Sequence, residues 1–146
     1  MLAVLAVFAY LWLSPSLPES ASELDGVWRD GDGMILSLGS YEDDEKSPLA
    51  GNMGTDVNSA GEIEVDDVLL RLSGRCRFSD NGGGTVVFGE FVYTPKTQRL
   101  IVFQFGPDMP RLYPVVDCRI TSFRDDKMTL TMDDGGAVQL ARKRNE

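Results

Sequence analysis

The stretch that decides the fold is residues 128–142, which read MTLTMDDGGAVQLAR. Apolar Met128 and Leu130 alternate with threonines, and after a glycine-containing turn the alternation resumes with Val138 and Leu140. A period of two residues is that of a strand buried on one face only, as in an antiparallel sheet. The stretch therefore predicts two neighbouring strands joined by a tight turn.

Similar short runs, separated by Gly, Asp, Asn and Pro, occur along most of the chain, and no helical period of useful length follows residue 24. Residues 40–61 have no periodicity and predict a long loop. We expect an all-β fold over residues 24–146, a single antiparallel barrel or sandwich of about eight strands. The expected strands are 26–30, 34–38, 62–72, 75–79, 85–93, 99–105, 115–123, 128–132 and 137–142.

Two of the middle runs, 85–93 and 99–105, are apolar on both faces. Such strands are covered on both sides, or one side faces a ligand cavity or a partner. The aromatic residues of these runs are our candidate contacts for a ligand or a partner: Phe88, Phe91, Tyr93, Phe103 and Phe105.

Residues 2–13, LAVLAVFAYLWL, form an apolar run without charge, and Pro15 and Pro18 end any helix there. Twelve helical residues rise only about 18 Å, against roughly 30 Å of bilayer hydrocarbon. We therefore expect a short apolar helix within residues 1–23, which acts as a signal peptide or as a retained membrane anchor followed by a linker. Cleavage is expected after Ser16 or Ser22, although no Lys or Arg precedes the run. The location expected from this segment is periplasmic or extracellular.

The chain has two cysteines, Cys76 and Cys118, each within strand-like alternation on an apolar face. An even number of cysteines in an exported protein favours one disulfide between them. The alternative is two buried free thiols that pack as small apolar residues.

The composition excludes several classes of function. The 146 residues contain 14 Lys and Arg, 23 Asp and Glu and no His, for a net charge of −9. Catalytic mechanisms that require histidine, and zinc sites with histidine ligands, are therefore excluded. The acidic balance also argues against a nucleic-acid partner.

The charge is divided unevenly along the chain. Residues 1–70 carry 14 acids and two bases, and residues 71–146 carry nine acids and 12 bases, which gives −12 and +3. Arg71, Arg75 and Arg77 alternate with apolar residues, so they are expected on one strand face. This row could bind a polyanion or an acidic partner, or it could be a solvated face that discourages edge pairing.

The remaining acidic residues give little evidence of a catalytic or metal-binding site. The turn 30–33 spaces two carboxylates as calcium loops do, but the bidentate Glu of such loops is missing. The cluster Glu62, Glu64, Asp66 and Asp67 has the residue type of a glycosidase pair, although their separation in space is not encoded. We expect no enzyme activity, no metal and no cofactor; a carboxylate-based hydrolase is the enzymatic alternative.

A resemblance to a known protein family rests on the two ends of residues 24–142. Gly26-Val27-Trp28 lies at the start of residues 24–142 as Gly-x-Trp, and Arg142 is the last residue of the final strand-like run. The pattern resembles the small bacterial lipocalin-like, or calycin-type, domains. The resemblance implies an up-and-down barrel of eight strands, closed at one end by Trp28 with Arg142 packed over its ring; Gly26 is the glycine of the motif. It also implies a cavity for a small apolar ligand, although the long acidic loop departs from the family pattern.

Two functions remain in favour. The first is an exported, non-enzymatic, lipocalin-like barrel that binds a small apolar ligand or a protein partner. The alternative is an accessory subunit of a larger protein complex, tethered to the membrane through residues 2–13.

Overall fold

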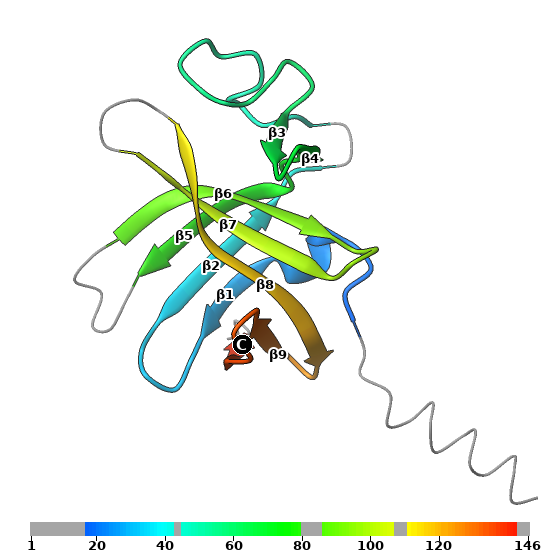
Figure 1. Cartoon of the computed structure of the whole chain (residues 1–146). Coiled ribbons are helices and arrows are strands. Elements are labelled where there is room, and N and C mark those ends of the chain that lie inside the picture. The colour runs from blue at the N-terminus through cyan, green and yellow to red at the C-terminus, as the bar shows by residue number, and fades with distance from the viewer. Residues whose placement is uncertain (1–16, 43–44, 80–85, 107–110, 143–146) are drawn as a thin grey trace, which may run out of the picture.

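The computed structural model describes residues 17–42, 45–79, 86–106 and 111–142. The chain forms a closed antiparallel barrel of eight strands, so the prediction of a barrel or sandwich is confirmed as a barrel (Figure 1). The elements are η1 (Ala21–Leu24), β1 (Gly26–Arg29), β2 (Ile35–Ser40), β3 (Glu62–Val65), β4 (Val68–Arg71), β5 (Gly74–Ser79), β6 (Val86–Thr94), β7 (Arg99–Phe105), β8 (Leu112–Arg124), β9 (Lys127–Met132) and β10 (Ala137–Arg142).

The barrel runs up and down, because each of its strands pairs with the next barrel strand along the chain. Only β3 and β4, among the described strands, stand outside it, as a separate two-stranded sheet inserted between β2 and β5. Pairing of Trp28 in β1 with Arg142 in β10 closes the ring. This architecture is compatible with a lipocalin-like fold.

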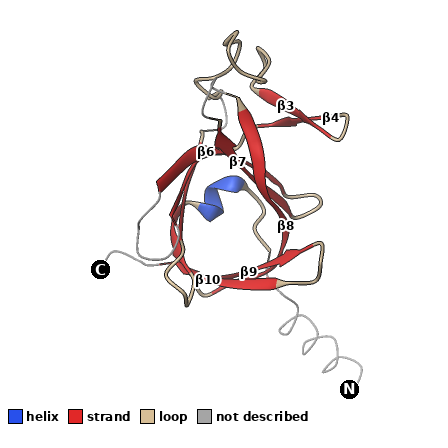
Figure 2. Cartoon of the chain, turned by 60° about the vertical axis from the view of Figure 1, so that its left-hand side comes forward, coloured by secondary structure: helices blue, strands red, loops and turns tan. Residues whose placement is uncertain are grey.

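The barrel interior is filled by the apolar side of the alternation. Trp28, Phe91, Leu100, Met128 and Leu140 are at most 1% exposed, and all belong to one buried cluster inside the ring. The alternation in 128–142 is therefore caused by burial of one strand face, as expected. Since η1 lies within the ring of strands in Figure 2, with Leu24 fully buried, this short helix closes one end of the barrel.

The predicted single strand 62–72 is wrong: the structure forms a hairpin from β3 and β4. Asp66 and Asp67 both adopt positive φ, at 51° and 65°, in the two-residue turn. Aspartate is among the few residues that tolerate this conformation, and two successive positive φ values match the right-handed twist of a hairpin. Residues 2–13, and with them the expected N-terminal helix, lie outside the described residues. No helix in the part of the chain that the structure describes is long and apolar enough to cross a membrane.

Candidate functional site

The closed end of the barrel is built around Trp28. Its side chain is completely buried, and the indole Nε1 donates a hydrogen bond to the carbonyl of Leu24 at 2.8 Å. The Arg142 guanidinium lies 4.7 Å from the centre of the Trp28 ring and 5.7 Å from that of Phe123. A cation over an indole face is attracted by the ring quadrupole. The three residues of the expected closure, Gly26, Trp28 and Arg142, are thus brought together.

Arg142 also joins three separate segments. Its Nη1 donates to the carbonyls of Glu23 and Asp25 at 2.8 and 3.0 Å, and its Nε donates to the Asp126 carboxylate at 3.0 Å. Gly26 makes room for this side chain, because a Cβ there would lie 2.7 Å from Arg142 Cδ. The φ of Gly26, +136°, is also one that other residues rarely adopt.

The insertion between β2 and β5 covers part of the outer face of β6 and β7. Phe103, Val92 and Ile101 are at most 2% exposed and belong to a second buried cluster. Val57 and Ile63 from the insertion complete that cluster. This second core explains why the two middle runs are apolar on both faces.

A buried carboxylate fixes the insertion to the barrel wall. Glu90 on β6 is 1% exposed and accepts hydrogen bonds from Ser47 Oγ at 2.5 Å and from Tyr41 OH at 2.5 and 2.8 Å. Burial raises the pKa of Glu90, and the two hydroxyl groups and nearby Arg75 act in the opposite direction. Burial, reinforced by Glu90, raises the pKa of Tyr41 to about 12.

The five aromatic candidates do not form one surface. Phe91 and Tyr93 point into the barrel core, whereas Phe103 lies under the insertion with Phe105 packed beside it. Phe88 stands apart on the outside, 59% exposed. Period-two alternation places neighbours on opposite faces, so a set drawn from both faces could not converge on one ligand.

The expected disulfide is wrong: Cys76 and Cys118 are free thiols. Cys76 lies on β5 and Cys118 on β8, with β6 and β7 between them in the ring. The Cys76 Sγ lies 3.5 Å from the carbonyl of Glu90, and the Cys118 Sγ lies 3.6 Å from that of Leu100. Burial raises the pKa of both thiols to about 12, which suits packing rather than nucleophilic reactivity.

The end of the barrel opposite to η1, which we call the open end, contains a cavity of about 170 Å³ among the described residues. Residues of four strands form its walls, and the lining includes one side-chain amide and, among the described residues, no charged group. A β-bulge at the Val102/Phe103 register shift brings Val115 and Val116 to the same wall. The lining residues are Cys76, Phe78, Val87, Val102, Phe103, Gln104, Val115 and Val116.

None of the aromatic candidates except Phe103 lines this cavity. The alternation could have separated the two faces of 85–93 and 99–105, but it does not show which face points inward, because both faces are apolar. Which end of the barrel is open could not, because that depends on where η1 packs.

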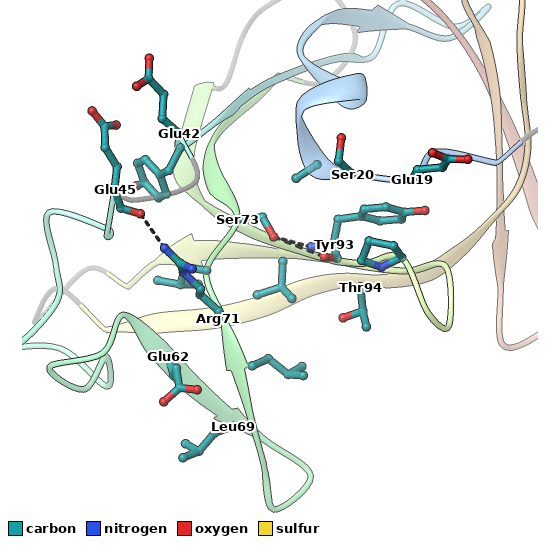
Figure 3. A pocket seen from close by; sticks show the side chains of 16 residues that line it. Glu19, Ser20, Glu42, Glu45, Glu62, Leu69, Arg71, Ser73, Tyr93 and Thr94 are labelled. Carbon is teal, nitrogen blue, oxygen red and sulfur yellow. Dashed lines mark hydrogen bonds between the residues drawn. The ribbon is translucent and has the colours of Figure 1, made fainter.

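A wider groove of about 590 Å³ lies at the closed end, between η1, the hairpin and the end of β6 (Figure 3). Its rim carries Glu42, Glu45 and Glu62 around Arg71, whose guanidinium donates to the carbonyl of Glu45 at 3.1 Å. In Figure 3 the carboxylates of Glu42 and Glu45 point away from that of Glu62.

The other acids considered as catalysts lie on the same hairpin. Glu64 projects from β3, and Asp66 and Asp67 form the turn. In the 30–33 turn, the Asp30 carboxylate accepts from the backbone N–H groups of Asp32 and Met34, which is hairpin chemistry. No group of three or more potential metal-ligating side chains occurs among residues 17–142 as far as they are described.

No family model, curated protein or solved structure matches the chain. The likeness to lipocalin-like domains therefore depends on the topology of the barrel and on the geometry of its closed end.

Proposed function

We propose that this protein is an exported, non-enzymatic, lipocalin-like binding protein that holds a small apolar ligand at the open end of its barrel. The observation that carries the proposal is the 170 Å³ cavity, walled by Phe78, Val87, Val102 and Val116. Pockets of this kind, apolar with few polar groups, are typical ligand sites at the mouths of β-barrels.

The size of the cavity limits the ligand. An apolar cavity of about 150 Å³ in another protein holds benzene, so a ligand of about six to nine non-hydrogen atoms fits here. At about −0.3 to −1.5 kcal/mol per atom, seven such atoms give about −2 to −10 kcal/mol. The middle of that range corresponds to a Kd on the order of 0.1 mM. Gln104 can donate to or accept from one hydroxyl or carbonyl group on the ligand.

Methyl NMR of the full chain tests this proposal, with benzene and a short alcohol as probes. Saturable shifts are expected at Val87, Val102 and Val116. Val102→Phe should abolish them by filling the cavity, and the milder Val116→Leu should weaken binding if Val102→Phe does not fold. The matched control is Val27→Phe on the outer face, where Val27 is 37% exposed, and this change should leave binding intact. Shifts that fail to saturate, or that persist in a folded Val102→Phe variant, would refute the ligand site.

We also propose that residues 2–13 direct export and, if retained, tether the chain to the membrane. The support comes from the segment that follows: Leu17 packs against the barrel core, and Tyr93 OH donates to the Pro18 carbonyl at 2.6 Å. A tether that enters at the closed end would leave the open end accessible.

The alternative function, an accessory subunit tethered in this way, draws on the same contacts. Cleavage after Ser22 would remove Leu17, Pro18 and Ala21 from the closed end, so cleavage after Ser16 or retention is expected. The intact mass of the protein from its native membrane and exported fractions distinguishes these outcomes. Cleavage after Ser16 excludes the tethered subunit, and cleavage after Ser22 contradicts the role given to residues 17–22.

A further inference from the structure

The outer face of β1, β2, β5 and β6 carries an exposed apolar and cationic surface. Strand register places Val27, Ser37, Arg77 and Phe88 in one row across the four strands. Val27 and Phe88 at the two ends of this row are exposed apolar side chains, and Val86, two residues from Phe88 on β6, faces the same side. We call the following six residues the arginine face: Val27, Arg29, Arg75, Arg77, Val86 and Phe88; their apolar members are 37–59% exposed.

Two of the cations on this face are available to an acidic partner. Arg29 and Arg77 are exposed, and neither takes part in an ion pair among the described residues. Arg77 instead lies 5.8 Å from the centre of the Phe88 ring. Arg75 is offset in part by buried Glu90, with which it pairs across β5 and β6. Arginine and aromatic residues, phenylalanine included, are enriched at protein–protein interfaces relative to the rest of the surface.

The β3–β4 hairpin has the opposite chemistry at its tip. Glu64, Asp66 and Asp67 are exposed there, beside Val68 and Leu69, which are 55% and 54% exposed. We call these five residues the acidic tip. Two large aliphatic side chains among three carboxylates match an apolar surface among arginines.

The acidic tip is held away from the arginine face of its own molecule. Asp66 forms an ion pair with Arg99 of β7 at 3.4 Å, and Ile63 is buried in the cluster under the insertion. The hairpin therefore stays over the covered side of the barrel, and the two surfaces can meet only between molecules.

We propose that the arginine face binds the acidic tip of a second copy of this chain. Val68 and Leu69 pack on Val86 and Phe88, while the carboxylates of Glu64 and Asp67 pair with Arg29 and Arg77. This interaction is independent of the small-ligand site. Because the two surfaces lie on different parts of the molecule, the contact is heterologous, and its repetition gives rings or open chains of molecules. A hairpin tip buries less than the roughly 1,000 Å² of a stable interface, so the association is weak and sensitive to salt.

Charge exchange between the two surfaces tests the proposal. Sedimentation equilibrium of the full chain in a neutrally buoyant detergent should show an average mass that rises above the 16.1 kDa monomer with concentration. Arg77→Glu or Glu64→Lys alone should weaken self-association about tenfold or more, about 1.4 kcal/mol. A mixture of the two variants should restore association, because the strand face made acidic in one variant then meets the hairpin tip made basic in the other. Lys96→Glu, the same reversal of charge at an exposed residue of the turn between β6 and β7, is the matched control and should behave as wild type.

Association that is equal in wild type and Arg77→Glu would place the contact elsewhere, for example in residues 1–16, and would overturn the proposal. A protein that stays monomeric throughout the concentration range would overturn it as well. Failure of the mixture to restore association while both single variants lose it would show that the two surfaces do not meet each other.

Discussion

Arg142→Ala should open the closed end of the barrel and lower the stability of the whole domain. The substitution removes hydrogen bonds to the carbonyls of Glu23 and Asp25, an ion pair with Asp126 and the contact with Trp28. The Arg142 and Asp126 side chains are 21% and 17% exposed, so this ion pair is better shielded from water than most surface pairs.

The magnitude follows from these contacts. A hydrogen bond to a charged group contributes about 1.5–3 kcal/mol, and water replaces part of it here because both carbonyls are accessible. We count one such hydrogen bond at the low end of this range, the cation–π contact at about 1 kcal/mol and the ion pair at about 1 kcal/mol. Together they give a loss of about 3–4 kcal/mol in the free energy of unfolding. In a domain of this size, that corresponds to a fall in Tm of about 10–20 °C.

Urea unfolding of the full chain, followed by tryptophan fluorescence, measures this loss. Arg142→Met keeps the aliphatic stem and should lose less than Arg142→Ala, and Arg119→Ala on exposed β8 should stay within about 0.5 kcal/mol of wild type. A double-mutant cycle with Asp126→Asn should show coupling between the pair. A loss for Arg142→Ala below about 1 kcal/mol, or equal to that of Arg119→Ala, would refute the role given to Arg142.

Other substitutions test separate parts of the structure. Gly26→Ala should lower the free energy of unfolding by about 1–3 kcal/mol because of the positive φ of Gly26. The loss should be smaller in the Arg142→Ala background, since the steric conflict with the Arg142 side chain is then absent. Additive losses in urea unfolding would contradict this. Burial raises the pKa of Glu90 above its ordinary 4.5, so wild type should lose stability as the pH rises from about 4.5 through the raised pKa. The urea midpoint of Glu90→Gln relative to wild type should therefore increase between acidic and mildly alkaline pH, and a constant difference would be inconsistent with a buried ionisable group. Phe103→Ala should lower the free energy of unfolding by about 3–5 kcal/mol, because this side chain is buried under the insertion. Phe88→Ala should change it by no more than about 0.5 kcal/mol, because Phe88 is exposed. Equal losses would show that the insertion does not cover Phe103. Both cysteine thiols should resist alkylation in the folded protein and yield an intact mass with no disulfide, since burial raises each pKa to about 12; rapid labelling would contradict their burial.

The strands were predictable from the sequence where burial of a strand face alone determines the pattern of apolar residues. Alternation in residues 128–142 reports burial of one face, and the structure pairs Met128 with Leu140 and Leu130 with Val138 as neighbouring inward residues. The two-sided apolar runs predicted either cover on both sides or one face turned to a ligand cavity or a partner, and the insertion provides the cover at Phe103 and Val92.

The remaining features depend on contacts between distant parts of the chain. Asp66-Asp67 lay inside a run of alternating residues, and only the pairing of β3 with β4 requires a turn there. The cysteines share apolar surroundings in sequence, but two intervening strands separate them in the ring. The cavity is a consequence of which end η1 closes, and a local pattern does not encode that choice.

The most direct test of the binding proposal is diffraction from crystals of the protein under xenon pressure. Xenon is a small apolar atom that occupies dry apolar cavities. The structure predicts xenon density at the open end, between Phe78, Val102 and Val116, and its loss in Val102→Phe crystals. Crystals that show no density in that cavity, or ordered water bound there instead, would contradict a site for a small apolar ligand.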